Sequence, residues 1–296
     1  MPERSCTLCP RHCRSARTPG DLGRCGMEAA AVIARAAPHF GEEPCISGSR
    51  GSGTVFFSGC ALGCVFCQNR AISTGGVGEA VSTRRLRAIF EEFEAMGLHN
   101  INLVTPTHFL PAILQALAEP RPALPVVWNS SGYESATALR KLAGKIQIYM
   151  PDMKYALSAP AARYADAPDY PARAREAIGE MYRQVGPYRM DRDGLLQSGL
   201  LIRHLILPGQ TENTRRVIDW VSDSFEPGTI LFSLMSQYTP CDVPPGFPEL
   251  ARPVTREEYE LCLRHLDTSR IETGYVQDLD ASGTQEIPAF DLTGVR

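Results

Sequence analysis

Three closely spaced cysteines are the residues whose types and spacing point most directly to chemistry. Cys60, Cys64 and Cys67 lie in the segment SGCALGCVFCQNR, in the pattern Cys-x3-Cys-x2-Cys. Three thiolates at such short spacing can bind three irons of a cubane [4Fe–4S] cluster and leave the fourth iron open, as a catalytic metal site requires. Zinc prefers four closed ligands, and this loop offers three. The segment therefore predicts a catalytic iron–sulfur cluster.

A second group of cysteines, Cys6, Cys9, Cys13 and Cys25, lies near the start of the sequence. Four thiolates suit either a closed [4Fe–4S] cluster or a structural zinc ion, and both interpretations stay open. The first thirty residues contain too few apolar side chains to build a core of their own, so metal–thiolate bonds would have to hold them together. The sequence therefore predicts an N-terminal metal-binding module.

The composition argues against several function classes. The chain has 296 residues and a formal net charge of −3, so no basic field is available for general nucleic-acid binding. The N-terminal region lacks the apolar run of a signal peptide, and no stretch approaches the roughly 18 apolar residues of a membrane span. We therefore expect a cytoplasmic protein that binds neither nucleic acid nor a membrane, and disulfide bonds are rare in that compartment.

Strands and helices are expected to alternate along the rest of the chain. Short apolar runs predict six strands, at residues 54–58, 101–105, 125–128, 146–150, 200–206 and 229–234. Helical spacing and capping residues predict helices at residues 82–97, 109–119, 134–143, 212–225 and from 255 to about 266. Six βα units in series imply a parallel sheet, either as an open barrel or as a doubly wound sheet.

Polar residues gather where these strands end, which is where parallel α/β folds carry their chemistry. The candidates are Thr107 and His108 after the second strand, Asn129 and Ser130 after the third, Asp152 and Lys154 after the fourth, and Arg203 on the fifth. Asp152 and Lys154 are two residues apart in an extended segment, so they point to the same side, as functional groups or as a solvated ion pair. Arg203 and His204 are neighbours, so one of them faces inward, and Arg203 could serve binding or packing.

At this point the sequence resembles the radical S-adenosylmethionine (SAM) superfamily, whose pattern is Cys-x3-Cys-x2-Cys with an aromatic residue, here Phe66, before the last cysteine. The segments EEPCISGSRGSGTVFFSGC, NINLVTPTHF, PDMKY, IRHLILPG and LMSQY resemble a PflX-type family related to pyruvate formate-lyase activating enzyme. The resemblance extends along nearly the whole chain. It implies a partial (β/α)6 barrel of the TIM type.

The resemblance also implies a reaction. SAM would bind the fourth iron, and its reductive cleavage would give a 5′-deoxyadenosyl radical that abstracts hydrogen from a protein, peptide or metabolite. An activase that places a glycyl radical on a partner enzyme is one such function. A flavodoxin or ferredoxin would supply the electron. The alternative is a non-catalytic iron–sulfur electron carrier or sensor, against which the open fourth iron argues.

Several residues acquire roles from the resemblance. Asp152 and Lys154 match an Asp-Leu-Lys segment near SAM and substrate, Asn129 and Ser130 match a polar turn beside SAM, and Arg203 matches an arginine that could reach the SAM carboxylate. Ordinary turn chemistry is the alternative for Asn129 and Ser130. The chain departs from the superfamily in one respect, because VTPTHFLP stands where a Gly-Gly-Glu-type motif often binds the methionine amino group. Thr105, Thr107 and His108 are the candidates for that contact.

We expect three segments: a metal-binding module at 1–30, the barrel at 31–245, and a C-terminal helix and extension at 246–296 that pack on the barrel. Six βα units leave a barrel open along one side, where an extended protein or peptide substrate could enter. The long connection at 159–199 is expected to flank that opening, with tyrosines for amphipathic contact at positions Tyr164, Tyr170, Tyr182 and Tyr188. The alternative is that this connection covers a pocket for a small metabolite.

Overall fold

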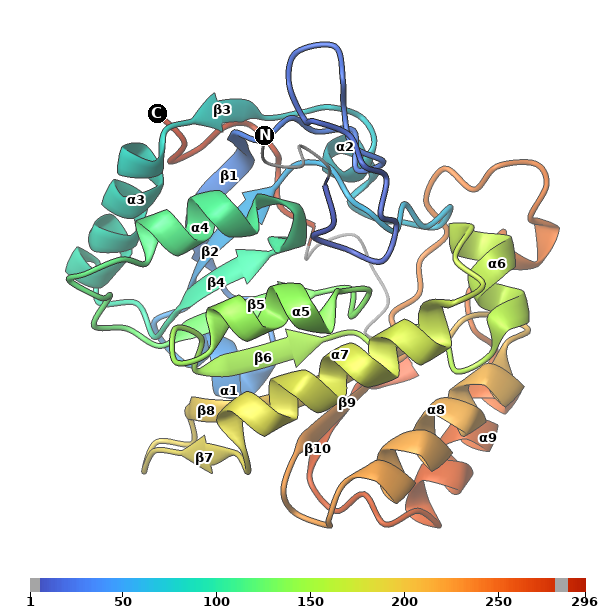
Figure 1. Cartoon of the computed structure of the whole chain (residues 1–296). Helices are drawn as coiled ribbons and strands as arrows, with labels where there is room; N and C mark the ends of the chain where they lie inside the picture. Colours follow the sequence, from blue (N-terminus) through green and yellow to red (C-terminus); the bar gives the residue numbers. More distant parts are fainter. Residues whose placement is uncertain (1–5, 280–286) are drawn as a thin grey trace.

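A computed structural model describes residues 6–279 and 287–296, which form a central sheet with helices packed against it (Figure 1). The strands are β1 (Ala31–His39), β2 (Ser52–Phe57), β3 (Glu79–Val81), β4 (Ile101–Val104), β5 (Val126–Ser130), β6 (Ile148–Pro151), β7 (Arg189–Met190), β8 (Leu196–Leu205), β9 (Leu231–Met235) and β10 (Gly274–Val276). The helices are α1 (Pro44–Ser47), α2 (Arg70–Ser73), α3 (Thr83–Ala95), α4 (Leu110–Ala116), α5 (Ala136–Leu139), α6 (Ser158–Ala165), α7 (Tyr170–Val185), α8 (Thr211–Ser224) and α9 (Arg256–Asp267). Short 3-10 turns cover Thr107–Phe109, Arg140–Leu142 and Pro248–Leu250.

The sheet follows the order β10-β9-β8-β6-β5-β4-β2-β1-β3, with β7 paired to β8. The six strands expected from the sequence are confirmed as β2, β4, β5, β6, β8 and β9, and they pair in parallel in the order of the chain. This order is that of an open barrel and differs from a doubly wound sheet, whose strand order reverses at a switch point. The sheet is not closed, because β3 and β10 are its edges among the described strands.

Four further strands, β1, β3, β7 and β10, lie outside the predicted six. β1 pairs antiparallel with both β2 and β3, and β10 joins the far edge in parallel with β9. The residues of β1, AVIARAAPH, combine several alanines with a proline and an arginine, so they lack the apolar run that marks the other strands. The C-terminal extension therefore does more than pack on the barrel, since β10 is part of the sheet.

The predicted helices form as the crossover connections, and two of their caps are those expected. The Ser82 side chain accepts a hydrogen bond from the Arg85 backbone N–H at the start of α3. Thr255 and Glu258 form a capping box at the start of α9. These contacts satisfy backbone N–H groups that have no partner within the first turn of a helix.

Alternation along the parallel strands divides their side chains between two cores. Trp128, Tyr149, Ile202 and Phe232 face outward and belong to the main core beneath the helices. Their neighbours face inward and pack with the short helix α1, forming a smaller core of Cys45, Ile46, Val127, Ile148, Met150, Leu196, Leu201 and Leu231. Because side chains alternate with a period of two, the inward positions closer to the carboxyl ends of the strands carry the polar residues of the site.

The N-terminal segment is docked on the cysteine loop by Arg11. Its guanidinium donates to the carbonyls of Ala61 (2.9 Å) and Leu62 (3.3 Å), which lie between Cys60 and Cys64, and to the carbonyls of Ala165 (2.7 Å) and Asp166 at the end of α6. Close approach also requires Gly59, since a Cβ there would lie 2.6 Å from the Cys25 carbonyl oxygen. The N-terminal segment and the cysteine loop are thus packed against each other.

The last residues of the chain return to the opposite end of the sheet. The Leu292 N–H donates to the Ala34 carbonyl and the Ala36 N–H donates to the Thr293 carbonyl, so the tail extends the exposed edge of β1. Arg35 binds the Asp291 carboxylate at 3.0 Å. Within residues 6–279 and 287–296, no helix combines the length and the apolar character needed to cross a membrane.

Candidate functional site

A cavity of about 230 Å3 opens at the carboxyl ends of the parallel strands. Its walls include the three cysteines of the Cys60 loop and polar residues from five strand ends. The sequence-predicted residues that line it are Cys60, Cys64, Cys67, Thr105, Asn129, Ser130, Asp152, Lys154 and Arg203. The fold therefore brings these nine candidates together in one place.

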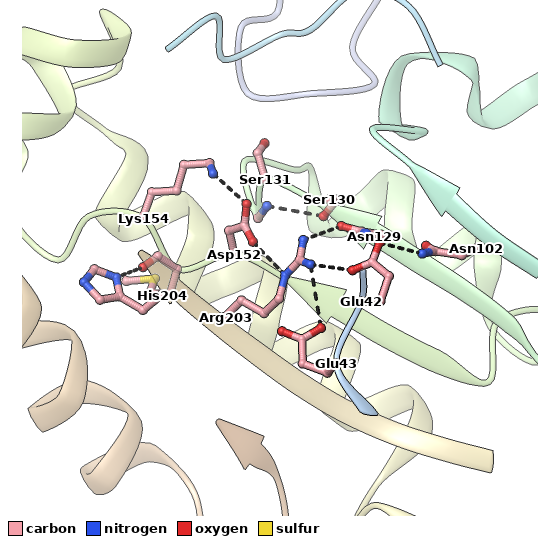
Figure 2. A network of polar contacts seen from close by, with 12 residues as sticks. Glu42, Glu43, Asn102, Asn129, Ser130, Ser131, Asp152, Lys154, Arg203 and His204 are labelled. Atoms are coloured by element: carbon pink, nitrogen blue, oxygen red, sulfur yellow. Dashed lines mark hydrogen bonds and ion pairs between the residues drawn. The ribbon is translucent and has the colours of Figure 1, made fainter. Parts of the chain in front are cut away.

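Arg203 is the centre of a buried polar network on the cavity wall (Figure 2). Its Nε donates to Asp152 Oδ1 at 3.1 Å, Nη1 to Glu42 Oε2 at 2.9 Å and Nη2 to Asn129 Oδ1 at 2.7 Å. Glu43 Oε2 lies 3.8 Å from Nη1. Arg203 thus faces inward, while His204 faces outward and contacts the Met153 carbonyl and Thr214 of α8. The guanidinium fixes the positions of three side chains from different elements.

Asp152 and Lys154 point to the same side, and the Lys154 ammonium lies 2.6 Å from Asp152 Oδ2. Burial raises the pKa of Asp152, but the Lys154 and Arg203 cations outweigh it and hold that pKa below its usual value. Burial lowers the pKa of Lys154, but the Asp152 carboxylate and the nearby Cys64 more than offset it, so the net shift is upward. Both groups are therefore charged at neutral pH.

The cysteine loop directs hydrogen-bond donors at its sulfurs. The backbone N–H groups of Gly63 and Leu62 donate to Cys60 Sγ, and the Tyr155 hydroxyl donates to Cys64 Sγ at 3.9 Å. Burial raises the pKa of the Cys64 thiol to about 12, against the effect of the Lys154 ammonium. Burial of a thiol together with donors and a cation suits a thiolate that is neutralised by a metal.

The three sulfurs of the cysteine loop suit some metal centres and not others. No group of three or more Cys, His, Asp or Glu side chains in the described ranges converges on one point to hold a single metal ion. A cubane cluster makes a different demand, since each thiolate binds a separate iron. Cys60, Cys64 and Cys67 are the cysteines among the described residues of the cavity wall, so this donor set suits a cluster with one open iron.

Thr107 and His108 lie behind the cavity and do not line it. The Thr107 hydroxyl donates to Glu134 Oε1 at 2.7 Å, because a 3-10 turn directs it away from the strand end. The His108 Nε2 lies 2.7 Å from the Ser58 carbonyl oxygen, and burial lowers the pKa of this imidazole to about 4. Within the VTPTHF segment, Val104 and Thr105 line the cavity, and Thr105 has a φ of 59°.

Glu134 is a buried carboxyl that the sequence analysis did not identify. It accepts hydrogen bonds from Thr107, from Trp128 Nε1 at 2.9 Å and from the Ser130 hydroxyl at 2.8 Å. Burial raises its pKa above the usual range for a glutamate, against the effect of these three donors. Ser130 therefore lines the cavity while its hydroxyl is engaged behind the wall.

Glu42 was also missed, although it lines the cavity and joins two strands to Arg203. Its Oε1 accepts from Asn102 Nδ2 at 2.9 Å and from Asn129 Nδ2 at 3.1 Å. It precedes α1, upstream of the first predicted strand, so strand-end reasoning did not reach it. The paired glutamates in the segment EEPCIS were the available signal.

The four N-terminal cysteines lie outside the cavity wall and close to one another. A Cβ at Gly23 would lie 3.1 Å from Cys25 Sγ and 3.7 Å from Cys13 Sγ, so these two thiols face the same glycine. Burial raises the pKa of Cys9 to about 12, against the effect of the Arg11 backbone N–H. Backbone N–H groups likewise oppose the effect of burial on the pKa of Cys13 and of Cys25.

The expected role of the 159–199 connection is wrong in one respect, because none of its four tyrosines lines the cavity. The connection folds into α6 and α7, whose apolar faces pack inward. Tyr164 and Tyr170 belong to the main core, and Tyr182 packs on Phe225. Tyr188 packs against the smaller core around α1. Amphipathic helices with inward tyrosines explain the difference.

No family model matches the chain. An uncharacterized protein of Methanocaldococcus jannaschii, MJ0674, is 27% identical over 250 residues, which cover 80% of this chain and 67% of that protein. Among solved structures, Streptococcus suis SuiB bound to the precursor peptide SuiA has a TM-score of 0.48 and 12% identity, over 74% of this chain and 46% of SuiB. SuiB bound to S-adenosylmethionine has a TM-score of 0.40 and 11% identity, over 74% and 45%. The chain thus spans about half the length of the SuiB chains.

Proposed function

We propose that this chain is a radical SAM enzyme in which Cys60, Cys64 and Cys67 hold a [4Fe–4S] cluster. The observation that carries the proposal is the meeting of three thiols with the Lys154–Asp152–Arg203 network on one cavity at the carboxyl ends of parallel strands. When bound, such a cluster supplies the electron that cleaves SAM to methionine and a 5′-deoxyadenosyl radical. The protein's own side chains would hold the reactants and exclude water.

Lys154 is the cation best placed to bind an anionic group of the ligand. One of its three N–H groups donates to Asp152, and the other two can donate to a carboxylate in the cavity. Arg203 donates to Asp152, Glu42 and Asn129, so its role here is to orient those side chains. We therefore assign the SAM carboxylate contact to Lys154 and a positioning role to Arg203.

Aromatic rings would limit the access of water to the cluster. Phe66, between two of the cysteines, packs edge-to-face on Tyr164 at 6.2 Å and on Tyr238 at 6.1 Å between ring centroids. Phe66 is 7% exposed. A reactive radical needs a dry site, because water exclusion suppresses side reactions.

We further propose a protein or peptide substrate that presents a single group to the cavity. The volume of about 230 Å3 is already small for one drug-sized ligand such as SAM, so it leaves no room to enclose a small-molecule substrate as well. Cluster and SAM would occupy much of that space. A glycyl-radical activase is one member of this class, and a flavodoxin or ferredoxin would be the electron donor.

For the N-terminal cysteines we propose a second metal site. The support is the close grouping of the four cysteines, in which the sulfurs of Cys13 and Cys25 face the same glycine, Gly23. Of the two alternatives, an iron–sulfur cluster fits better than zinc, because no group of three or more metal-ligating side chains among the described residues converges to hold a single ion. Such a site would lie close to the cysteine loop, because Arg11 joins the two segments.

The decisive experiment is anaerobic reconstitution, with iron and sulfide analysis, EPR of the reduced protein, and measurement of 5′-deoxyadenosine. Replacing Cys60, Cys64 and Cys67 by Ala should abolish SAM cleavage, and metal retained in this variant would belong to the N-terminal cysteines. Cys262→Ala, at a buried cysteine of α9, is the matched control and should cleave SAM normally. Cleavage by the triple variant would refute the proposal, and a reducible cluster without SAM cleavage in the wild type would indicate an electron carrier.

A further inference from the structure

Tyr155 places a phenol hydroxyl on one sulfur of the cysteine loop. It follows Lys154 just after β6, is 0% exposed, and donates from its hydroxyl to Cys64 Sγ at 3.9 Å. A buried phenol needs a hydrogen-bond partner, and here the fold supplies a sulfur. The contact joins the segment that carries Asp152 and Lys154 to the loop that carries the cysteines.

The ring of Tyr155 is held in this orientation by Tyr170 of α7. The two rings meet edge-to-face with centroids 5.2 Å apart. The Tyr170 hydroxyl accepts the backbone N–H of Lys154 at 2.8 Å and lies 2.8 Å from the Asp152 carbonyl oxygen. Ring contact and backbone hydrogen bonds together fix the direction of the Tyr155 O–H group.

We propose that Tyr155 is a positioning residue that tunes the cluster through Cys64: its hydrogen bond to the sulfur raises the reduction potential of the [4Fe–4S] cluster. This inference rests on the proposed function. A donor draws electron density from the thiolate, so it favours the reduced cluster, which carries one more negative charge. Reduction of the cluster thereby becomes easier for its electron donor.

The hydrogen bond from Tyr155 to the cysteine loop can be removed by a substitution that leaves the net charge of the protein unchanged. The donors to Cys60 Sγ are backbone N–H groups of Leu62 and Gly63, and the cation near Cys64 is Lys154, which the proposed function uses for ligand binding. Replacing Tyr155 by Phe removes one hydroxyl and keeps the ring that packs on Tyr170. A change in potential can then be assigned to the hydrogen bond.

The test is the midpoint potential of the cluster, measured by EPR-monitored redox titration of the reconstituted full chain. Tyr155→Phe should move the potential to a more negative value. The matched control is Tyr149→Phe, which removes an equally buried hydroxyl that donates to Gln184 at 2.7 Å, and it should titrate like the wild type. Equal potentials for all three proteins, or an upward shift in Tyr155→Phe, would overturn the inference.

A second substitution keeps the test decisive where the phenylalanine variant assembles no cluster. Replacing Tyr155 by 3,5-difluorotyrosine preserves the ring and makes the hydroxyl a stronger donor, so the potential should rise. An unchanged or lowered potential would refute the role of the hydrogen bond. The two proposals fail differently: a wild type without a reducible cluster contradicts the proposed function, whereas a normal cluster insensitive to both substitutions contradicts only the role of Tyr155.

Discussion

Replacing Arg203 by Met should destabilise the apoprotein strongly, because the network around it holds opposite charges out of water. Arg203 and Lys154 face the carboxylates of Asp152 and Glu42, and the Arg203 and Glu42 side chains are 15% and 8% exposed. The substitution keeps a long apolar side chain but leaves the carboxyl groups of Asp152, Glu42 and Glu43 with one ammonium. Lys154 still pairs with Asp152, so Glu42 and Glu43 are the groups that lose their cation.

The magnitude follows from the burial of this network. Removing one partner of a buried ion pair costs about 3–5 kcal/mol, because the remaining charge is left without compensation. For a chain of 296 residues that corresponds to a fall in melting temperature of roughly 5–8 °C. The surface arginine Arg216, whose side chain is 58% exposed beside Glu212, is the matched control, and Arg216→Met should cost below about 1 kcal/mol.

Urea unfolding of the metal-free chain at several pH values is the assay. Arg203 is one of the two cations that hold the pKa of Asp152 below its usual value. The ionised Asp152 therefore stabilises the wild type at pH values above its unfolded-state pKa. This stabilisation is lost as the pH falls through the folded-state pKa. Without Arg203 the carboxyl binds a proton at higher pH, so the deficit of Arg203→Met should narrow as the pH is lowered from 7. The reasoning would be refuted if Arg203→Met lost no more free energy of unfolding than Arg216→Met. It would also be refuted if the difference in free energy of unfolding between Arg203→Met and the wild type grew as the pH was lowered.

Two further predictions concern the same wall of the cavity. Asp152→Asn and Lys154→Met should leave the iron and sulfide content of the reconstituted protein near that of the wild type but reduce the formation of 5′-deoxyadenosine. The reason is that both side chains line the cavity without being thiolate ligands. Unchanged turnover in both variants would contradict their role. Burial raises the folded-state pKa of Glu134, so wild-type stability should fall as the pH rises from about 4.5 through that pKa, and Glu134→Gln should remove this contribution. The free energies of unfolding of the two proteins, measured in urea and plotted against pH, should diverge between about pH 4.5 and 7. Parallel plots would contradict this assignment.

The strands of the barrel were predictable because their apolar runs are buried on both faces. Every residue of β2 and of β5 is buried, so the sequence signal was continuous there. The alternation of side chains then correctly separated Arg203, facing in, from His204, facing out. β1 was not predicted, because alanine and proline have a low preference for strands. Pairing with β2 and β3 nevertheless holds it in the sheet.

The site was predictable where a residue follows a strand directly and not where a turn intervenes. Asp152 and Lys154 continue β6 in extended form, and both line the cavity. Thr107 and His108 enter a 3-10 turn, which redirects their side chains toward Glu134 and Ser58. Glu42 reaches the network from a distant part of the chain, and no local pattern reports that Arg203 is its partner.

The pairing of the tail with β1 has a consequence for synthesis on the ribosome. Arg35 and Asp291 are 256 positions apart, yet they hold neighbouring stretches of backbone together. The part of the β1 edge that β3 does not cover, at Ala34 and Ala36, therefore stays unpaired until residues 292 and 293 have been translated. The strands beside it can pair much earlier. Unpaired strand edges attract other chains, so the nascent protein is expected to stay prone to aggregation until these two residues have been made. A pause in synthesis shortly before residues 292 and 293 should therefore lower the yield of folded protein more than a pause before β1 has been made.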